Sequence, residues 1–174
     1  TLEVLNLSGN RLRDLPPGLG RLRHLKIIFC SDNRFTELPE VLGECPALEM
    51  VGFKANRIAA VPGSALPARL RWLILTDNAI AHLPDELGQR PALQKLMLAG
   101  NRLSALPEGL AQAERLELLR ISANRFNSLP AWLTRLPRLA WLALAGNPLG
   151  WSRAADAPLP RVNWPDLSVA ERLG

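Results

Sequence analysis

One asparagine returns along the chain at nearly constant intervals, and this spacing constrains the fold more than any other feature of the sequence. Apolar residues recur at fixed offsets around it, as in the segment LQKLMLAGNRLSALPEGL that begins at Leu93. A period in this range is typical of solenoids, in which each repeat buries its apolar face only against its neighbours. The sequence therefore predicts a stack of seven repeats. The asparagines, separated by 23, 23, 22, 23, 23 and 23 residues, are Asn10, Asn33, Asn56, Asn78, Asn101, Asn124 and Asn147.

Each repeat begins with an alternation of apolar and variable residues that predicts a short β-strand, because successive strand side chains point to opposite faces. The asparagine ends that strand, where its amide can pair with backbone groups of the turn, and stacked repeats would align these amides into a ladder. A Leu-Pro or Val-Pro pair then begins a return segment such as PEVLGECP, which is long enough for a short helix. The expected core pairs are Leu5 and Leu7, Ile28 and Cys30, Val51 and Phe53, Leu73 and Leu75, Leu96 and Leu98, Leu119 and Ile121, Leu142 and Leu144.

These elements predict an α/β fold: a right-handed βα solenoid with a parallel concave sheet of seven short strands and short convex helices or 3-10 turns. In the third repeat the segment VPGSALPARL, residues 61–70, is one residue shorter and predicts an extended or 3-10 crossing. We expect residues 1–149 to form the repeat domain, with a truncated first repeat that continues upstream in the natural protein. Residues 150–174 should form a C-terminal cap and a linker toward a further domain. Pro148, Leu149 and Trp151 are expected to cover the last core, and DAPLPR to be extended.

The composition, 48% hydrophobic and 21% charged over 174 residues, is that of an ordinary soluble domain. No apolar run reaches the roughly 18 residues of a membrane span, and the first residues lack the pattern of a signal peptide. The two cysteines, Cys30 and Cys45, have no metal-ligand spacing and predict buried thiols in a reducing compartment. We therefore expect a cytoplasmic protein without membrane insertion, with a secreted effector as the alternative.

Function is expected on the strand residues that point away from the core, since stacking joins equivalent positions into one surface. Most of them are apolar, although a solvated face is ordinarily polar, and aromatic residues and Met are enriched at the centres of interfaces. The hypothesis is a protein-binding concave face; the alternative is that a segment of the same protein, or another copy, covers it. The candidate residues are Ile27, Phe29, Met50, Trp72, Ile74, Lys95, Met97, Leu118, Arg120 and Trp141.

The chain carries a formal charge of +5, and a set of its arginines lies outside the concave strand residues. Five of the seven asparagines are followed by arginine, which places one cation at an equivalent edge position in most repeats. Such a row could attract phosphates. We expect nearby acidic residues to neutralise much of it, and we expect no nucleic acid partner. The row, called the arginine row below, is Arg11, Arg34, Arg57, Arg102 and Arg125; the acids are Asp14, Glu37, Asp85, Glu86 and Glu108.

No catalytic constellation is present. His24 and His82 lie in different repeats without a spaced nucleophile or metal partner, and the chain holds no G-x-S-x-G and no complete phosphate-binding loop. The sequence therefore predicts a chain that is not itself an enzyme and needs no cofactor or metal.

The repeat line, L-x-x-L-x-L-x-x-N-x-L-x-x-L-P, resembles that of intracellular leucine-rich repeat proteins of the Ras-group class, with about 23 residues per repeat. The segments LRWLILTDN, LQKLMLAGN and LELLRISANRF are also similar to the repeat half of bacterial leucine-rich-repeat protein kinases. The tail VNWPDLSVAERLG resembles the lead-in to the kinase in that family, where Leu173 and Gly174 would begin the glycine-rich loop over ATP.

This resemblance implies that the chain is a recognition or regulatory domain of a protein kinase, and that it can contact a downstream kinase domain of the same molecule. Two alternatives remain open. The chain could be the repeat domain of a bacterial effector ubiquitin ligase, or a free-standing interaction scaffold.

Overall fold

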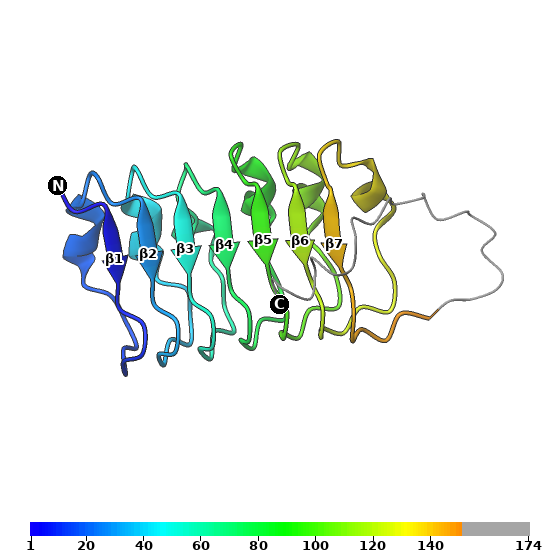
Figure 1. The fold of residues 1–174 in the computed structure, drawn as a ribbon, viewed down its shortest axis with the longest axis horizontal. Coiled ribbons are helices and arrows are strands. Elements are labelled where there is room, and N and C mark those ends of the chain that lie inside the picture. The colour runs from blue at the N-terminus through cyan, green and yellow to red at the C-terminus, as the bar shows by residue number, and fades with distance from the viewer. Residues whose placement is uncertain (151–174) are drawn as a thin grey trace, which may run out of the picture.

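Seven parallel strands form one sheet whose order in space follows the order of the chain (Figure 1). The computed structural model describes residues 1–150. Each strand contains three residues and stands in one repeat, so the predicted fold class is confirmed. The strands are β1 (Val4–Asn6), β2 (Ile27–Phe29), β3 (Met50–Gly52), β4 (Trp72–Ile74), β5 (Lys95–Met97), β6 (Leu118–Arg120) and β7 (Trp141–Ala143).

Residues at equivalent positions of neighbouring repeats pair with each other in the sheet. Trp72 of β4 pairs with Lys95 of β5, for example, and Ile74 pairs with Met97. Between these positions Leu73 and Leu96 are fully buried. Because a slip of one residue would turn the buried leucines to solvent, burial of one face fixes the register of the whole sheet.

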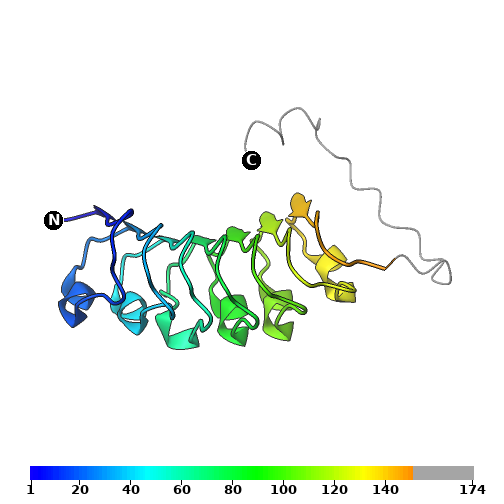
Figure 2. The ribbon, with the colours of Figure 1, turned by 90° about the horizontal axis from the view of Figure 1, so that it is seen from below.

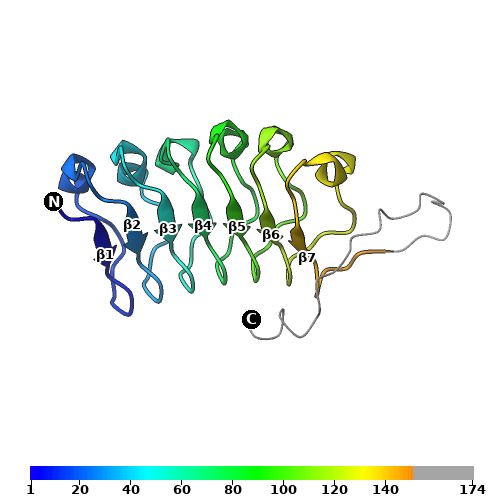
Figure 3. The ribbon, with the colours of Figure 1, turned by 45° about the horizontal axis from the view of Figure 1, so that its top comes forward.

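Within residues 1–150, six short 3-10 helices return the chain along the other side of the arc. Figure 2 shows the strands on the inner side and the helices on the outer side, and Figure 3 shows the helices following one another along one edge. Each helix begins directly after the proline of a Leu-Pro or Val-Pro pair, whose fixed φ suits a helix start. The helices are η1 (Pro17–Arg21), η2 (Glu40–Glu44), η3 (Gly63–Ala65), η4 (Asp85–Gln89), η5 (Glu108–Gln112) and η6 (Ala131–Arg135).

The short third repeat contains the shortest of these helices. Helix η3 has three residues, whereas the other five have five residues each. The predicted 3-10 crossing is confirmed. The neighbouring repeats also cross in 3-10 helices, so the third repeat differs from them only in the length of its helix. The deletion is thus absorbed on the convex side, and the strand register of β3 and β4 is unchanged.

The core lies between the sheet and the helices and consists mainly of leucine and other aliphatic residues, with three buried phenylalanines, Phe35, Phe53 and Phe126. The strand residues predicted to face it are fully buried in the five central repeats, and Cys30 is buried among them in place of a leucine. Burial raises the pKa of the Cys30 thiol to about 12. The pKa of Cys45 is raised as well, first by burial and then by the charge of Glu44. Both thiols therefore act as neutral core groups.

The repeated asparagines join each repeat to the one before it. The side-chain amide of Asn101 donates to the backbone oxygens of Leu98 and Ala99 in its own repeat, at 3.0 and 3.4 Å, and of Leu75 in the preceding repeat, at 2.9 Å. Its Oδ1 accepts from the backbone N–H of Ile80, also in the preceding repeat, at 3.0 Å. One buried side chain thus satisfies four backbone groups and crosses the repeat boundary twice.

The same contacts to the preceding repeat recur at Asn33, Asn56, Asn78, Asn124 and Asn147. Asn10 differs. Its amide donates to Leu7 and Ser8 of its own repeat only, and its side chain is exposed. The predicted asparagine ladder is therefore confirmed.

A left-handed turn precedes every ladder asparagine. All seven residues at this position have positive φ, between 51° and 77°, and three of them are glycines. The other four are not glycine, and for alanine this conformation is costly because Cβ crowds the following carbonyl. These residues are Gly9, Asp32, Ala55, Asp77, Gly100, Ala123 and Gly146.

The two ends of the stack differ in what covers the core. At the C-terminal end Leu149 is partly buried and packs against the core, as predicted. Trp151 and the expected cap and linker over residues 150–174 lie outside the described residues, except for Gly150. At the N-terminal end β1 has no neighbour on its outer edge among residues 1–150, and Leu2 and Val4 are exposed.

Replacing Asn101 by alanine should lower the free energy of unfolding by about 3 kcal/mol, because it leaves buried backbone groups of two repeats unpaired. The matched change Asn10→Ala removes no contact to a preceding repeat and should cost less than about 1 kcal/mol. Urea denaturation followed by circular dichroism measures both. Equal losses for the two variants would contradict the coupling role of the ladder.

Candidate functional site: the concave face

The strand register places all ten predicted site residues on the concave face, in two rows that run across the strands. Within each strand the site residues flank a central residue of the opposite orientation, such as Ile28 or Leu73, that is fully buried. The rows are therefore continuous from β2 onward, as the repeat predicts. The first row is Ile27, Met50, Trp72, Lys95, Leu118 and Trp141; the second is Phe29, Gly52, Ile74, Met97 and Arg120.

All ten predicted site residues are partly exposed. The contact between Phe29 and Gly52 shows how the apolar side chains shield one another. A Cβ atom at Gly52 would lie 2.6 Å from Cδ1 of Phe29, so the ring lies over the glycine of the next strand and buries it. The apolar stripe, defined as Ile27, Phe29, Met50, Trp72, Ile74, Met97 and Leu118, is thus a packed surface with part of each side chain open to solvent.

Two neighbouring side chains, Lys95 and Gln94, contact Trp72 and orient its ring. The ammonium nitrogen of Lys95 lies 3.9 Å from the centroid of the Trp72 ring, within the range of a cation–π interaction. The indole N–H of Trp72 donates to Oε1 of Gln94 at 3.2 Å. An aromatic side chain that is already oriented loses less conformational entropy when a partner covers it, so Trp72 is well placed to act as an anchor.

A polar ladder, which the sequence alone did not predict, lies beside the first row, one residue before each of the strands β3 to β6. Arg71 donates to Oε2 of Glu49 at 3.4 Å and to Oε1 of Gln94 at 3.3 Å, and Gln94 donates to Oε2 of Glu117 at 3.0 Å. These residues occupy one repeat position. Its charges alternate in sign over the first four repeats, and this pattern could have been read from the aligned repeats, which hold Glu3, Lys26, Glu49, Arg71, Gln94 and Glu117 there. Exposed pairs of this kind contribute little stability, so their effect is to orient Gln94 and, through it, Trp72.

Histidine, cysteine and acidic side chains are the other candidates for a functional cluster. His24 and His82 are exposed, and within residues 1–150 no three His, Cys, Asp or Glu side chains gather closely enough to hold a metal ion. In the same residues no helix has the length and apolar character needed to cross a bilayer.

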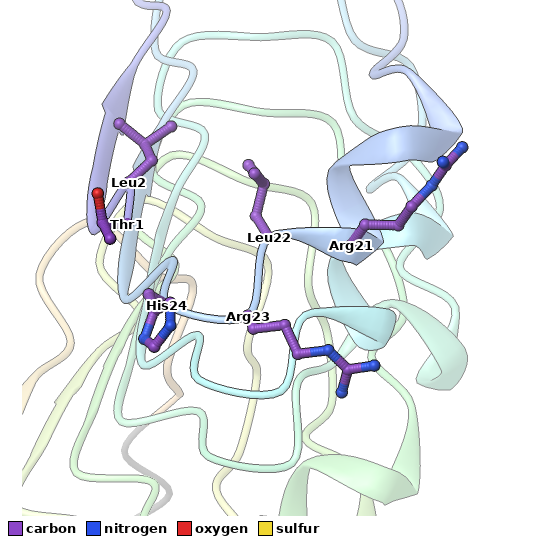
Figure 4. Close-up of a pocket in the computed structure, with 6 residues that line it drawn as sticks. All are labelled: Thr1, Leu2, Arg21, Leu22, Arg23 and His24. Atoms are coloured by element: carbon purple, nitrogen blue, oxygen red, sulfur yellow. The ribbon is translucent and has the colours of Figure 1, made fainter.

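A hollow of about 190 Å³ opens at the N-terminal end of the stack (Figure 4). Thr1, Leu2 and His24 lie on one side of it, and Arg21 lies on the other. Leu2 and Leu22 are its apolar lining, and the Arg21 and Arg23 side chains point away from Thr1 and Leu2 rather than converging on the hollow.

An open stack of parallel strands with an asparagine ladder and short convex helices defines the class of leucine-rich solenoids. The sequence comparison specifies the family. A model described as "Leucine rich repeat" matches residues 68–126 and 91–149, and one described as "Leucine Rich repeats (2 copies)" matches residues 1–43. The chain belongs to the leucine-rich repeat family.

Solved structures with the same architecture agree with this assignment. A leucine-rich repeat protein of Leptospira interrogans is 29% identical, with a TM-score of 0.65 over 84% of this chain and 43% of its own. The plant peptide hormone receptor RGFR1, solved in complex with RGF2, is 29% identical, with a TM-score of 0.69 over 84% of this chain and 28% of its own.

An internalin from Listeria monocytogenes, at 20% identity, has a TM-score of 0.73 over 84% of this chain and 42% of its own, and shows the fold alone. The chain spans less than half the length of each of these three structures. No curated protein matches the sequence.

Adding a methyl group at Gly52 should displace the Phe29 ring. Because Cβ would approach Cδ1 to 2.6 Å and Cε1 to 3.0 Å, Gly52→Ala should lower the free energy of unfolding by about 1 kcal/mol. In a Phe29→Ala background the same change should be nearly neutral, since the ring is gone. A double-mutant cycle by chemical denaturation measures this coupling, and additive losses would show that Phe29 does not lie on Gly52 in solution.

Proposed function

We propose that this chain is a protein interaction module that binds its partner through the concave face. The observation that carries the proposal is the apolar stripe, which stays partly exposed across five adjoining strands, β2 to β6, on a face that is ordinarily polar. Phe29, Trp72 and Met97 are its proposed anchors, because aromatic residues and Met are enriched at interface centres.

The polar ladder and Lys95 supply the surroundings that such an interface needs. Affinity at protein interfaces concentrates in a few desolvated anchors, while polar groups around them exclude water and fix orientation. Here Gln94 and Lys95 lie directly against Trp72 and would form that polar border. The plant receptor, an LRR protein that was solved in complex with RGF2, supports binding of a protein or peptide ligand.

For the whole protein we propose a bacterial protein kinase, cytoplasmic, in which this domain recognises a partner or contacts the kinase domain downstream. The proposal rests on the resemblance of the repeats and of the tail ending at Leu173 and Gly174. The alternatives are the repeat domain of an effector ubiquitin ligase and a scaffold without an enzyme domain. The coding sequence after Gly174 separates the three. A glycine-rich loop followed by V-A-x-K supports the kinase, a catalytic cysteine domain supports the ligase, and a stop codon supports the scaffold.

The double variant Trp72→Ala with Met97→Ala should weaken binding of an identified partner by at least about 2 kcal/mol, or roughly 30-fold in Kd. Neither side chain belongs to the buried core, so the fold should be retained. The partner is captured with the full-length protein, identified, purified and titrated calorimetrically.

The matched control is Gln89→Ala with Gln112→Ala, two exposed side chains on the outer helices η4 and η5. It should leave Kd unchanged. Unaltered affinity of the concave variant, with native circular dichroism, would refute the assignment of the site.

A further inference from the structure

We propose that the arginine row is a second binding surface, which holds an acidic, extended segment of a protein partner along the edge of the solenoid. All five arginines of the row are exposed, and each directly follows a ladder asparagine. The row is separate from the apolar stripe, because it lies on the chain after the strand and the left-handed turn. The proposal therefore stands independently of the function of the concave face.

Backbone hydrogen bonds hold the row in register from repeat to repeat. The N–H of Arg34 donates to the oxygen of Leu12 at 2.8 Å, and the N–H groups of Arg57 and Arg125 make the equivalent bonds at 2.9 and 2.8 Å. Repeats joined in this way are spaced like strands of a sheet, at about 5 Å. Arg11, Arg34 and Arg57 are therefore neighbouring cations on one rigid edge.

The acids expected to neutralise the row form no ion pair with it within residues 1–150, and the extent of neutralisation stays a prediction. In the part of the chain that the structure describes, the ion pairs are Lys26 with Glu3 and Arg71 with Glu49, all outside the row. Two of these carboxylates accept hydrogen bonds from the backbone. Asp14 accepts from the backbone N–H of Leu15 at 2.8 Å, and Asp85 accepts from that of Gly109 at 2.9 Å.

Like charges at this spacing repel one another in water of low ionic strength, and an anion laid along the row relieves that repulsion. An extended peptide fits because its side chains on one face recur every second residue, at about 6.6 to 6.8 Å, which flexible arginine stems can follow.

A nucleic acid fits less well. The aromatic residues that directly follow the row within residues 1–150, Phe35 and Phe126, are fully buried, so neither ring is available for base stacking. The row is also interrupted in the fourth repeat, where Ala79 replaces arginine and Asp77 is exposed. An unbroken phosphate backbone would be repelled there, whereas a peptide can place an uncharged residue at that point.

The probe is a fluorescein-labelled peptide of alternating glutamate and threonine, ten residues long, titrated with the chain at low salt and followed by fluorescence anisotropy. Arg34→Gln with Arg57→Gln should weaken binding at least about tenfold, because it removes two neighbouring cations. The control Arg21→Gln with Arg135→Gln changes net charge equally, at exposed positions of η1 and η6, and should change Kd less than about twofold.

A variant that should bind the peptide more tightly tests the same proposal. Tighter binding cannot result from destabilisation of the fold, whereas weaker binding could. Ala79→Arg fills the interruption and should tighten peptide binding about threefold. Trp72→Ala with Met97→Ala should leave peptide binding unchanged, so failure of this proposal and failure of the concave site are distinguishable.

Three results would overturn the proposal: equal weakening by the row variant and the control, absence of binding at low salt, or tighter binding of a ten-residue oligothymidine that depends on the same arginines. The last result would assign the row to nucleic acid.

Discussion

The structure depends on one interaction, the pairing of an asparagine amide with the backbone of the preceding repeat. Apolar burial supplies most of the stability of such a stack but is not directional. The amide is directional: in Asn101 it accepts from Ile80 and donates to Leu75, so two repeats can meet in only one register. Without that register the outward residues of neighbouring strands would not align, and neither the apolar stripe nor the arginine row would exist as a surface.

The sequence was sufficient to predict the strands, the core and the concave rows, because a fixed period and a strict alternation leave one arrangement that buries every leucine. Details that depend on contacts between repeats were not predicted. Whether Phe29 covers Gly52, or Lys95 lies over Trp72, is decided by packing between residues 23 positions apart. The left-handed turn was missed since glycine occupies only three of its seven positions. Ion pairs between the acids and the arginine row are not seen in residues 1–150, where Asp14 and Asp85 accept hydrogen bonds from backbone N–H groups.

The two proposed binding surfaces would have complementary physical roles. An apolar stripe with oriented aromatic groups determines how long a partner stays, because burial of such anchors governs dissociation. A row of unpaired cations acts at longer range and mainly speeds association with acidic partners, to a degree that salt controls. One rigid backbone ladder presents both, so they can be altered separately without changing the fold.

The central claim is that the concave face is the binding surface, and hydroxyl-radical footprinting of the chain with its purified partner tests it most directly. Met50, Trp72 and Met97 react readily with the radical and lie in the apolar stripe, whereas Trp132 lies on the outer helix η6. The account predicts that oxidation of the three stripe residues falls at least about fivefold in the complex, while oxidation of Trp132 is unchanged. Protection of Trp132, with no protection of the stripe, would contradict it.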